Sequence, residues 1–468
     1  MSANWTFDQL KTQLLNQKDI RAWIIHEEHI HRRERYFMCE DQQFITDQDR
    51  KVNTQNILVR LFVNSANQGR QGEITKRFFT AVPLKEQISQ AVQMAKDTDH
   101  QTWTLPTEIP TNLFEPKTTD PRMAEDIETA MNDVTAQIEL AVRRGGSGGF
   151  DSSFNSPFNS LFNSAEVFLS IHTHELHLSN GLVHRYSQSR IYVEAAFSFT
   201  KADENGVLQS DEYLSTQWAG HLDDLPVGQL FADTSNRASQ SLDTVKPATG
   251  NYSVIIDSEV LSTLLNGHLS QLSASHAYNG LPFIKPGAEL IPNATGDLLS
   301  ITLDPTLDYG ANSISVSEQG IAQKPLRLVN NNSVIATATD KQYGDYLGIS
   351  ATTVRGNLVI DPGRMTHHEL TQQADQVIEI LQFSGLFADV NSGTFSSEIR
   401  LARLYDNKKG TITYIKGGSV SGAITENFKE LRLTKSRVRR SHFSSETSPG
   451  QGYYGPDFAL ITQVSVVG

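Results

Sequence analysis

Residues 250–280 read GNYSVIIDSEVLSTLLNGHLSQLSASHAYNG. The apolar segment 252–256 predicts a short strand, and Asp257 and Ser258 behind it can cap a helix. A strand that feeds a capped helix is a common place for a functional site, because a rigid helix fixes the directions of its side chains. The polar positions at 266–271 (NGHLSQ) therefore decide what a site here could do. Apolar residues beyond the cap recur at spacings of one, three and four, as one helix face requires; they are Val260, Leu261, Leu264, Leu265, Leu269 and Leu272.

Further along the chain, short motifs follow one another in a fixed order. They read LDP at 303–305, SEQG at 317–320, RLVNNN at 327–332, DPGRMTHHEL at 361–370, SGL at 384–386, GTFS at 393–396 and ITYI at 412–415. Each motif alone is weak, but together they resemble the C-terminal region of the TldD/PmbA proteins. Proteins of this family pair as TldD and TldE subunits in a bacterial and archaeal metallopeptidase. Within the fourth motif, Thr366 and Glu369 predict a capping box at the start of a helix.

The resemblance makes residues 266–271 decisive for the type of subunit. In TldD-type chains, the helix after a Leu-Leu pair carries His-Glu-x-x-x-His, whose imidazoles bind zinc while the glutamate activates the metal-bound water. Alignment on the Leu-Leu pair places Asn266 at the first histidine, Gly267 at the glutamate and Gln271 at the second histidine. All three functional groups would be missing, so the resemblance implies a TldE (PmbA)-type chain.

The tail of the chain points to the same type of subunit. TldD-type chains carry a cysteine before a Gly-Lys-x-Gly-Gln segment near the end, and its thiolate is the third protein ligand to zinc. The corresponding stretch here reads SPGQG at 448–452, so that Ser448 stands in the cysteine's place. The resemblance thus implies no catalytic residues and no metal in this chain, and zinc in a TldD-type partner.

Length and composition indicate a multidomain cytoplasmic protein. The 468 residues predict two to three domains, and a hydrophobic content of 38% is sufficient for buried cores. No run of about 18 apolar residues predicts a membrane span, and the polar N-terminal segment does not resemble a signal peptide. The single cysteine, Cys39, excludes an internal disulfide. A net charge of −13 argues against nucleic-acid binding, and the basic run at 435–440 is interpreted as a solvated edge or loop.

The order of the expected elements predicts an α+β fold. We predict an N-terminal α+β domain at 1–101, followed at 102–164 by a linker, a long helix and a Gly/Ser/Asn/Phe-rich loop. The remainder, 165–468, is predicted to be a larger, mainly antiparallel β domain with a few helices. Helices are expected over 6–16, 82–97, 123–142, 224–242 and 366–383, and strands over 21–31, 35–46, 55–63, 73–81 and 166–178, among others.

Two further features leave alternatives open. Three Phe-Asn-Ser triplets between 154 and 164 could dock into a partner or substrate groove, or their rings could pack on the chain's own surface. If the segment IHTHELH at 171–177 is a strand, His172 and His174 share a face and could bind a metal. We favour the interpretation that these are exposed histidines on a polar strand face.

Two classes of function remain. The first is a noncatalytic subunit that pairs with a TldD-type chain, or with itself, and holds flexible or unfolded peptides beside the partner's zinc. Sheet edges in the C-terminal domain could bind such peptides by strand addition, although no residues are assigned to this role. The second class is an independent homodimeric binding protein, or a diverged enzyme with a new site and no peptidase role.

Overall fold

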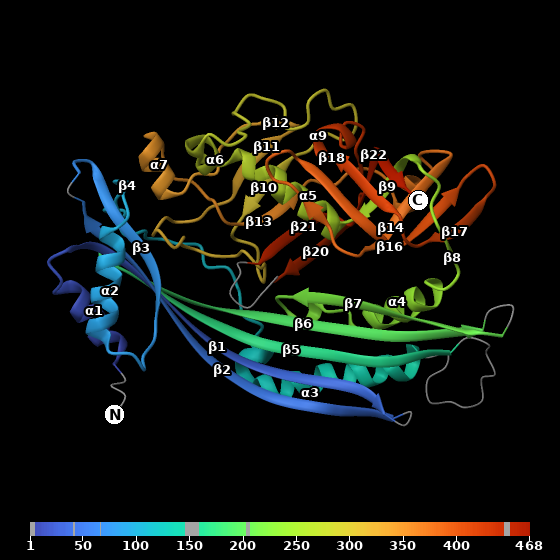
Figure 1. Cartoon of the computed structure of the whole chain (residues 1–468), viewed down its shortest axis with the longest axis horizontal. Coiled ribbons are helices and arrows are strands. Elements are labelled where there is room, and N and C mark those ends of the chain that lie inside the picture. Colours follow the sequence, from blue (N-terminus) through green and yellow to red (C-terminus); the bar gives the residue numbers. More distant parts are fainter. Residues whose placement is uncertain (1–4, 41–42, 66, 146–158, 203–205, 444–449) are drawn as a thin grey trace.

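The computed structural model describes the chain except for residues 1–4, 41–42, 66, 146–158, 203–205 and 444–449. It is a mixed α+β structure, as the sequence predicts, and it has two layers (Figure 1). One layer is a long, twisted antiparallel sheet. The other is a β-rich C-terminal part that lies over this sheet.

The first layer contains seven strands. They are β1 (Ile20–Glu40), β2 (Gln43–Asn64), β3 (Arg70–Phe78), β4 (His100–Gln101), β5 (Asn159–Leu178), β6 (Val183–Ala202) and β7 (Leu208–Ala219). Their order in the sheet is β4-β3-β2-β1-β5-β6-β7, and all neighbours are antiparallel. Four of these strands have 20 to 22 residues. Because side chains alternate between the two faces of the sheet, each long strand presents about ten side chains on each face.

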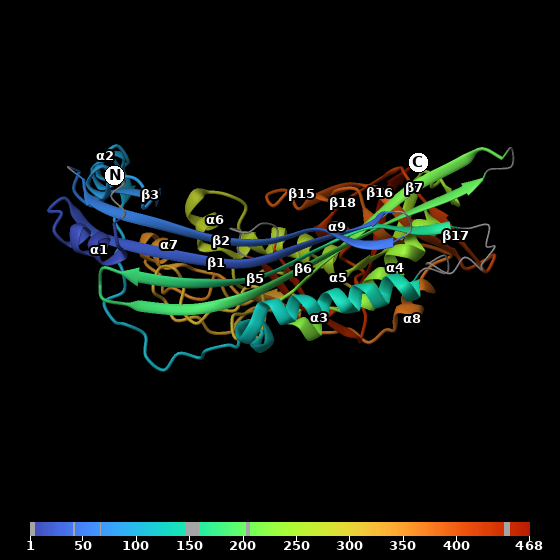
Figure 2. The ribbon, with the colours of Figure 1, turned by 90° about the horizontal axis from the view of Figure 1, so that it is seen from below.

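Helices cover one face of this sheet and its N-terminal end (Figure 2). α3 (Pro121–Gly145) and α4 (Val227–Gln240) pack together against one face, where they bury odd-numbered residues of β5 and β6 such as Val167 and Val193. At the N-terminal end, α1 (Phe7–Leu15) and α2 (Leu84–Lys96) form a smaller core with β1, β2 and β3. The opposite face is left for the C-terminal part to cover.

The C-terminal part contains a six-stranded and a nine-stranded sheet around a shared apolar core. The first has the order β12-β11-β10-β13-β21-β20, with bounds Ser333–Val334, Leu326–Asn330, Ile301–Asp304, Asn357–Ile360, Gln451–Pro456 and Arg437–His442. The second has the order β14-β9-β22-β18-β16-β17-β8, with bounds Gln376–Phe383, Gly250–Asp257, Phe458–Val467, Ser419–Ala423, Thr394–Asp406, Thr411–Ile415 and Thr244–Val245; β15 (Phe387–Ala388) and β19 (Arg432–Leu433) join its side. The helices here are α5 (Ser258–Leu269), α6 (Ala274–Asn279), α7 (Lys341–Leu347), α8 (His367–Thr371) and α9 (Ile424–Asn427).

The strand and helix predicted over 250–280 are confirmed. β9 lies between β14 and β22, and α5 follows it directly. The carboxylate of Asp257 caps α5 by accepting the backbone N–H groups of Glu259 at 3.1 Å and Val260 at 2.9 Å. The predicted apolar face of α5 is fully buried at Leu264 and Leu265 in the core between the two sheets. A 3₁₀ turn, Ser270–Leu272, extends the helix past its end.

Two predicted elements are wrong. Residues 35–46 are not one strand, because β1 runs unbroken to Glu40 and residues 43–46 begin β2. The charged residues in the middle of β1 are accommodated by ion pairs, such as that of Arg33 with Glu128 on α3 at 3.0 Å. Residues 366–383 are not one helix, because α8 ends at Thr371 and 376–383 form β14. The capping box of Thr366 and Glu369 is confirmed.

The strands group differently from the sequence-based division of the chain. The boundaries after residues 101 and 164 remain a prediction about domains, but the first sheet runs across residue 165, because β5 pairs with β1 along most of its length. Residues 146–158 contain the first Phe-Asn-Ser triplet and lie outside the described part. The third triplet is within β5, where Phe162 is buried and its ring lies 5.7 Å from that of Phe197. This phenylalanine packs on its own chain.

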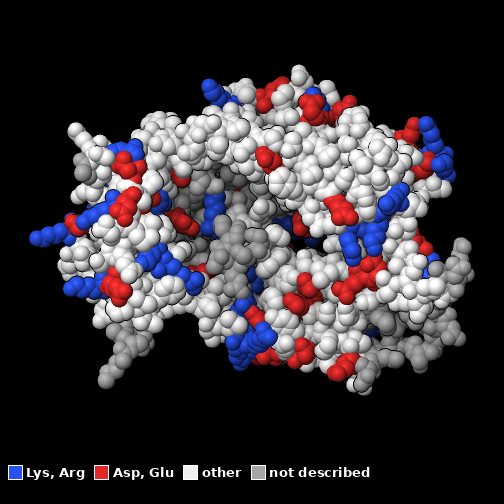
Figure 3. Space-filling model, in the orientation of Figure 1, with Lys and Arg blue, Asp and Glu red and all other residues white. Residues whose placement is uncertain are grey.

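Over the part of the chain that the structure describes, no helix combines the length and apolar character needed to cross a membrane. On the face seen in Figure 3, Lys and Arg side chains are interspersed with Asp and Glu. That face therefore presents no extended basic surface of the kind that nucleic acids attract.

Candidate functional site

The residues singled out on the sequence lie at the C-terminal end of α5. Asn266 and Gly267 are in the last turn of the helix and are half-buried, and Gln271 is buried in the 3₁₀ turn that follows. The side-chain amide of Gln271 donates to the carbonyl oxygen of Val390 at 2.7 Å and to that of Asn391 at 3.2 Å. Gln271 therefore holds the loop between β15 and β16 in place.

The same loop occupies the space beside the helix. A Cβ atom at Gly267 would lie 3.5 Å from Cγ1 of Val390, so a longer side chain there would have to pass this residue. The neighbouring His268 is buried, with Nε2 3.4 Å from the carbonyl oxygen of Leu290. Burial lowers the pKa of His268, which keeps the imidazole neutral near pH 7. His268 and Gln271 thus make their polar contacts with backbone carbonyls of two different segments.

Ser448, the position aligned with the family's tail cysteine, lies outside the described residues. The strands on either side of it, β20 and β21, pair in antiparallel fashion from Arg437 with Pro456 to His442 with Gln451. Phe443, just after β20, is buried and lies under the guanidinium group of Arg190 at 4.8 Å. This end of the tail therefore reaches the face of the first sheet.

Polar side chains of β1, β5 and β6 line that face of the sheet. Strand registers place Glu28 of β1 opposite His174 of β5, and His174 opposite Tyr186 of β6. His172 lies two residues from His174 on the same side, as predicted for a strand. Contrary to our expectation, both histidines are buried, because the C-terminal part covers this face.

Glu28, His172 and His174 form a compact group. Oε1 of Glu28 lies 2.9 Å from Nδ1 of His172 and 3.9 Å from Nε2 of His174. Among the described residues, this is the one group of three or more His, Cys, Asp or Glu whose ligand atoms lie within 4.8 Å of one another. None of its members is on α5. The arrangement fits a metal ion in the chemistry of its donors, a carboxylate and two imidazoles.

The protonation states of this group follow from its surroundings. Burial by itself raises the pKa of Glu28, but hydrogen bonds from His172 and Asn56 outweigh it and lower the pKa to about 2. Burial, with His26 alongside, lowers the pKa of His174 to about 2. Burial also lowers the pKa of His172. At neutral pH the group is therefore a carboxylate beside two neutral imidazoles.

A cavity of about 250 Å³ opens beside this group. Glu28 and His174 line it on the side of the sheet, and Glu318 and Arg355 line it on the side of the C-terminal part. Arg190 is also in the wall; burial lowers its pKa to about 10, which leaves it charged at neutral pH. The cavity thus has cationic and anionic groups together.

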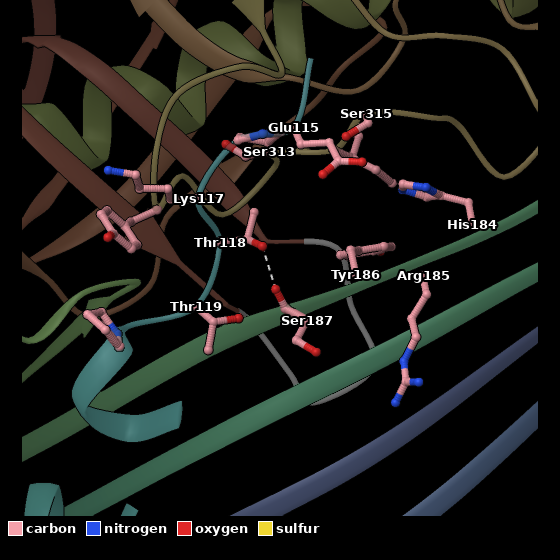
Figure 4. A pocket seen from close by; sticks show the side chains of 14 residues that line it. Glu115, Lys117, Thr118, Thr119, His184, Arg185, Tyr186, Ser187, Ser313 and Ser315 are labelled. Atoms are coloured by element: carbon pink, nitrogen blue, oxygen red, sulfur yellow. Dashed lines mark hydrogen bonds between the residues drawn. The ribbon is translucent and has the colours of Figure 1, made fainter. Parts of the chain in front are cut away.

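A second cavity, of about 580 Å³, lies at the edge of the sheet (Figure 4). β7 pairs with β6 only from Ile191 onward, so residues 183–190 extend beyond the end of β7. The linker covers part of this edge: the N–H of Ser189 donates to the carbonyl of Thr118 at 2.9 Å, and the hydroxyl of Thr118 donates to the carbonyl of Ser187. The backbone N–H and C=O groups of alternate residues in a strand point to the same side. Ser187 and Ser189 direct these groups away from β5, so Arg185, which lines the cavity, directs its own groups the same way.

The partners of the two histidines could not be found from the sequence. Glu28 and His172 are 144 residues apart in the chain, and only the register of β1 with β5 brings them together. The one indication in the sequence was that His172 and His174 are two residues apart, which places them on the same face of a strand. Asn266, Gly267 and Gln271, by contrast, are neighbours in both sequence and structure.

Comparison with known families identifies the class of the C-terminal part. Residues 249–468 match the PmbA/TldA metallopeptidase C-terminal domain, a range that includes β9, α5 and every later element. This C-terminal part, residues 249–468, therefore matches the TldD/PmbA family, as the order of its motifs predicted.

Solved structures share the fold over the whole chain. A candidate modulator of DNA gyrase from Bacteroides thetaiotaomicron has a TM-score of 0.72 at 15% identity, with 98% of each chain covered. Another from Thermotoga maritima has a TM-score of 0.71 at 15% identity, covering 99% of this chain and 100% of that one. TldE from Thermococcus kodakarensis has a TM-score of 0.72 at 13% identity, with 98% of each chain covered. No curated protein matches the chain in sequence.

Proposed function

We propose that this chain is a noncatalytic, TldE-like subunit of a TldD/TldE-type zinc metallopeptidase complex. The observation that carries the proposal is the role of Gln271, whose amide bonds the carbonyls of Val390 and Asn391 at the position where a TldD-type chain has a zinc ligand. The NH₂ group of this amide is committed to two backbone carbonyls, and an amide offers zinc neither an imidazole nor a carboxylate. Asn266 and Gly267 offer neither an imidazole nor a carboxylate at the other two positions.

In this proposal the catalytic zinc belongs to a TldD-type partner, and the chain contributes a surface for the substrate. The proposed substrates are flexible or unfolded peptides. The edge of β6 at 183–186, next to the part that the linker covers, supports peptide binding, because outward backbone groups there can add a strand with little dependence on side chains. This edge lies within the predicted C-terminal domain at 165–468, where sheet edges were expected to bind peptides, but it is part of the first sheet and not of the two C-terminal sheets.

The similarity to TldE from Thermococcus kodakarensis supports the proposed TldE type of subunit. That protein and the two candidate gyrase modulators share the fold with this chain at 13–15% identity. The proposed setting is the cytoplasm. A second candidate, an independent homodimer that has diverged to a new site, is favoured by one observation, the buried group of Glu28, His172 and His174.

The proposal is tested by assembly with a defined partner. The chain is mixed with the TldD-type protein encoded in the same genome, and the mass of the product is measured by size-exclusion chromatography with light scattering. A complex with one copy of each chain is expected. A chain that stays in a homodimer, or stays monomeric, in the presence of that partner would favour the second candidate.

A further inference from the structure

The face of the first sheet carries three potential ligand atoms in the spacing of a metal site. They are Oε1 of Glu28, Nδ1 of His172 and Nε2 of His174, and the carboxylate oxygen lies 2.9 and 3.9 Å from the two nitrogens. A tetrahedral ion with bonds of about 2.0–2.2 Å holds its ligand atoms about 3.3–3.6 Å apart. The two oxygen–nitrogen separations are within about 0.4 Å of this range and the two nitrogens lie at most 4.8 Å apart, so side-chain movements of about 1 Å would reach the required geometry.

The second polar atom of each of these side chains already has a partner. Oε2 of Glu28 accepts the amide of Asn56 at 3.0 Å, which aims Oε1 at the histidines. Nδ1 of His174 lies 3.1 Å from Nε2 of His26, so a proton on this nitrogen leaves Nε2 of His174 as a free lone pair. Metal-binding histidines and carboxylates are held by outer partners of this kind.

His172 has the same support through Ser170. Nε2 of His172 lies 3.1 Å from Oγ of Ser170, and Oγ of Ser170 is 3.4 Å from the carbonyl of Arg190. Without a metal, Nδ1 of His172 donates to Glu28. With a metal on Nδ1, the proton moves to Nε2 and donates to Ser170, whose own hydroxyl turns to the carbonyl of Arg190. The imidazole stays neutral in both states.

Nε2 of His174 is the atom that the metal-free group leaves without a partner. No hydrogen bond among the described residues involves it, and its nearest carboxylate oxygen is at 3.9 Å. The cavity of about 250 Å³ lies on this side, between the histidine and the C-terminal part. Three protein ligands with an open fourth side are typical of zinc sites that exchange a ligand, whereas structural sites are closed.

The geometry points to a divalent transition-metal ion, with Zn²⁺ as the model, bound by Glu28, His172 and His174 on the face of the first sheet. Glu28 supplies only one negative charge. In the adjoining cavity the charge of Glu318 is matched by that of Arg77, and Arg190 and Arg355 carry two further positive charges. The fourth ligand is therefore an exchangeable anion, hydroxide or a carboxylate, for which the two guanidinium groups provide the counter-charge. This site is separate from α5, and it departs from our sequence-based expectation that the chain binds no metal.

Metal titration of the full chain tests the site. The purified protein is stripped with a chelator and titrated with Zn²⁺ by calorimetry and with Co²⁺ by visible absorption, since Co²⁺ reports coordination by four or five ligands. One ion per chain is expected. His174→Ala, His172→Ala and Glu28→Gln should weaken binding more than the 10- to 100-fold that loss of an outer partner costs, and Asn56→Ala should fall within that range.

The control is His31→Ala. His31 is exposed on the same strand as Glu28, bonds Asn53 at 2.7 Å and faces away from the site, so its replacement should leave the titration unchanged. If His172→Ala or His174→Ala does not fold, His174→Gln preserves polarity and volume and takes its place. The absence of binding by the wild-type chain, or binding that survives in His174→Gln and Glu28→Gln, would overturn the site. Either result leaves the proposal for α5 untouched, because none of these variants alters α5.

Discussion

Gln271 and Val390 are joined by a hydrogen bond of 2.7 Å from the side-chain amide to the backbone carbonyl. The bond ties the turn after α5 to the loop between β15 and β16, and a second bond to Asn391 at 3.2 Å reinforces it. A histidine has one donor nitrogen to offer in its neutral form and could not make both bonds while it coordinates a metal. The residue at this position can therefore serve the loop or a metal, but not both.

The first prediction is a loss of stability in Gln271→Ala. The carbonyls of two residues would be left without their donor in a buried site, which costs about 1–3 kcal/mol of the free energy of unfolding. Urea denaturation measures this change. Gln48→Ala, at an exposed position, should stay within about 0.5 kcal/mol of wild type. An equal effect of the two substitutions would contradict a structural role for Gln271.

The second prediction concerns pH. Burial lowers the pKa of His268 in the folded chain below its ordinary value of 6.5, so the unfolded chain binds the proton first as the pH falls. The stability associated with neutral His268 is present above pH 6.5 and is lost progressively below it. His268→Leu should reduce the slope of stability against pH between 6.5 and 5 by at most about 1.4 kcal/mol per pH unit.

The measurement for His268 is the unfolding free energy at a series of pH values. His31→Leu controls for the loss of an imidazole at an exposed position. An unchanged slope in His268→Leu would mean that this imidazole is protonated to the same degree in the folded and unfolded chains.

The third prediction tests the edge of β6 as a peptide site. Arg185→Pro removes one outward N–H but leaves the ladder with β5 intact, since proline is tolerated at a sheet edge. Loss of one hydrogen bond of about 1 kcal/mol should weaken binding of a labelled flexible peptide about five-fold, measured by fluorescence anisotropy. Arg185→Ala removes the charge and keeps the N–H. If alanine and proline have equal effects, the backbone edge does not bind the peptide.

Local patterns in the sequence predict the local structure of this chain well. The cap at Asp257, the helix behind it and the capping box at Thr366 were all predicted, because each depends on residues within four positions of one another. The predicted helix over 366–383 failed for a physical reason. In residues 376–383 (QVIEILQF) the four consecutive positions 377–380 are buried, and burial on both faces leaves no period that separates a strand from a helix.

The candidate sites show the same limit. Asn266, Gly267 and Gln271 could be found from the sequence because they share one helix end. The role of Gln271 could not, because its acceptors are 119 and 120 residues away. The alternation of His172 and His174 was visible, but their burial and the contact with Glu28 depend on strand pairing and on the C-terminal part that covers the sheet.

The fourth prediction is that a zinc site on α5 cannot be restored by one change. Positions 266 and 271 are about 500° apart around a helix, or about 140° in direction, and Val390 lies close to Gly267 and is bonded by Gln271. In a His174→Ala background, which removes the site on the sheet, Asn266→His combined with Gly267→Glu and Gln271→His should bind zinc weakly. Ser448→Cys should tighten the binding, with little or no peptide cleavage. Calorimetry decides, and tight binding by Asn266→His alone would mean that His268 already forms part of a latent site.

The central claim is that this chain needs a TldD-type partner for peptide cleavage. The most direct measurement is hydrolysis of a flexible peptide with zinc present, by the chain alone, by the TldD-type chain of the same genome alone, and by the two mixed. We predict no cleavage by this chain alone and cleavage by the mixture that is unchanged when Asn266→Ala is introduced here. Cleavage by this chain alone, abolished by Glu28→Gln or His174→Gln, would contradict the account and make it an enzyme in its own right.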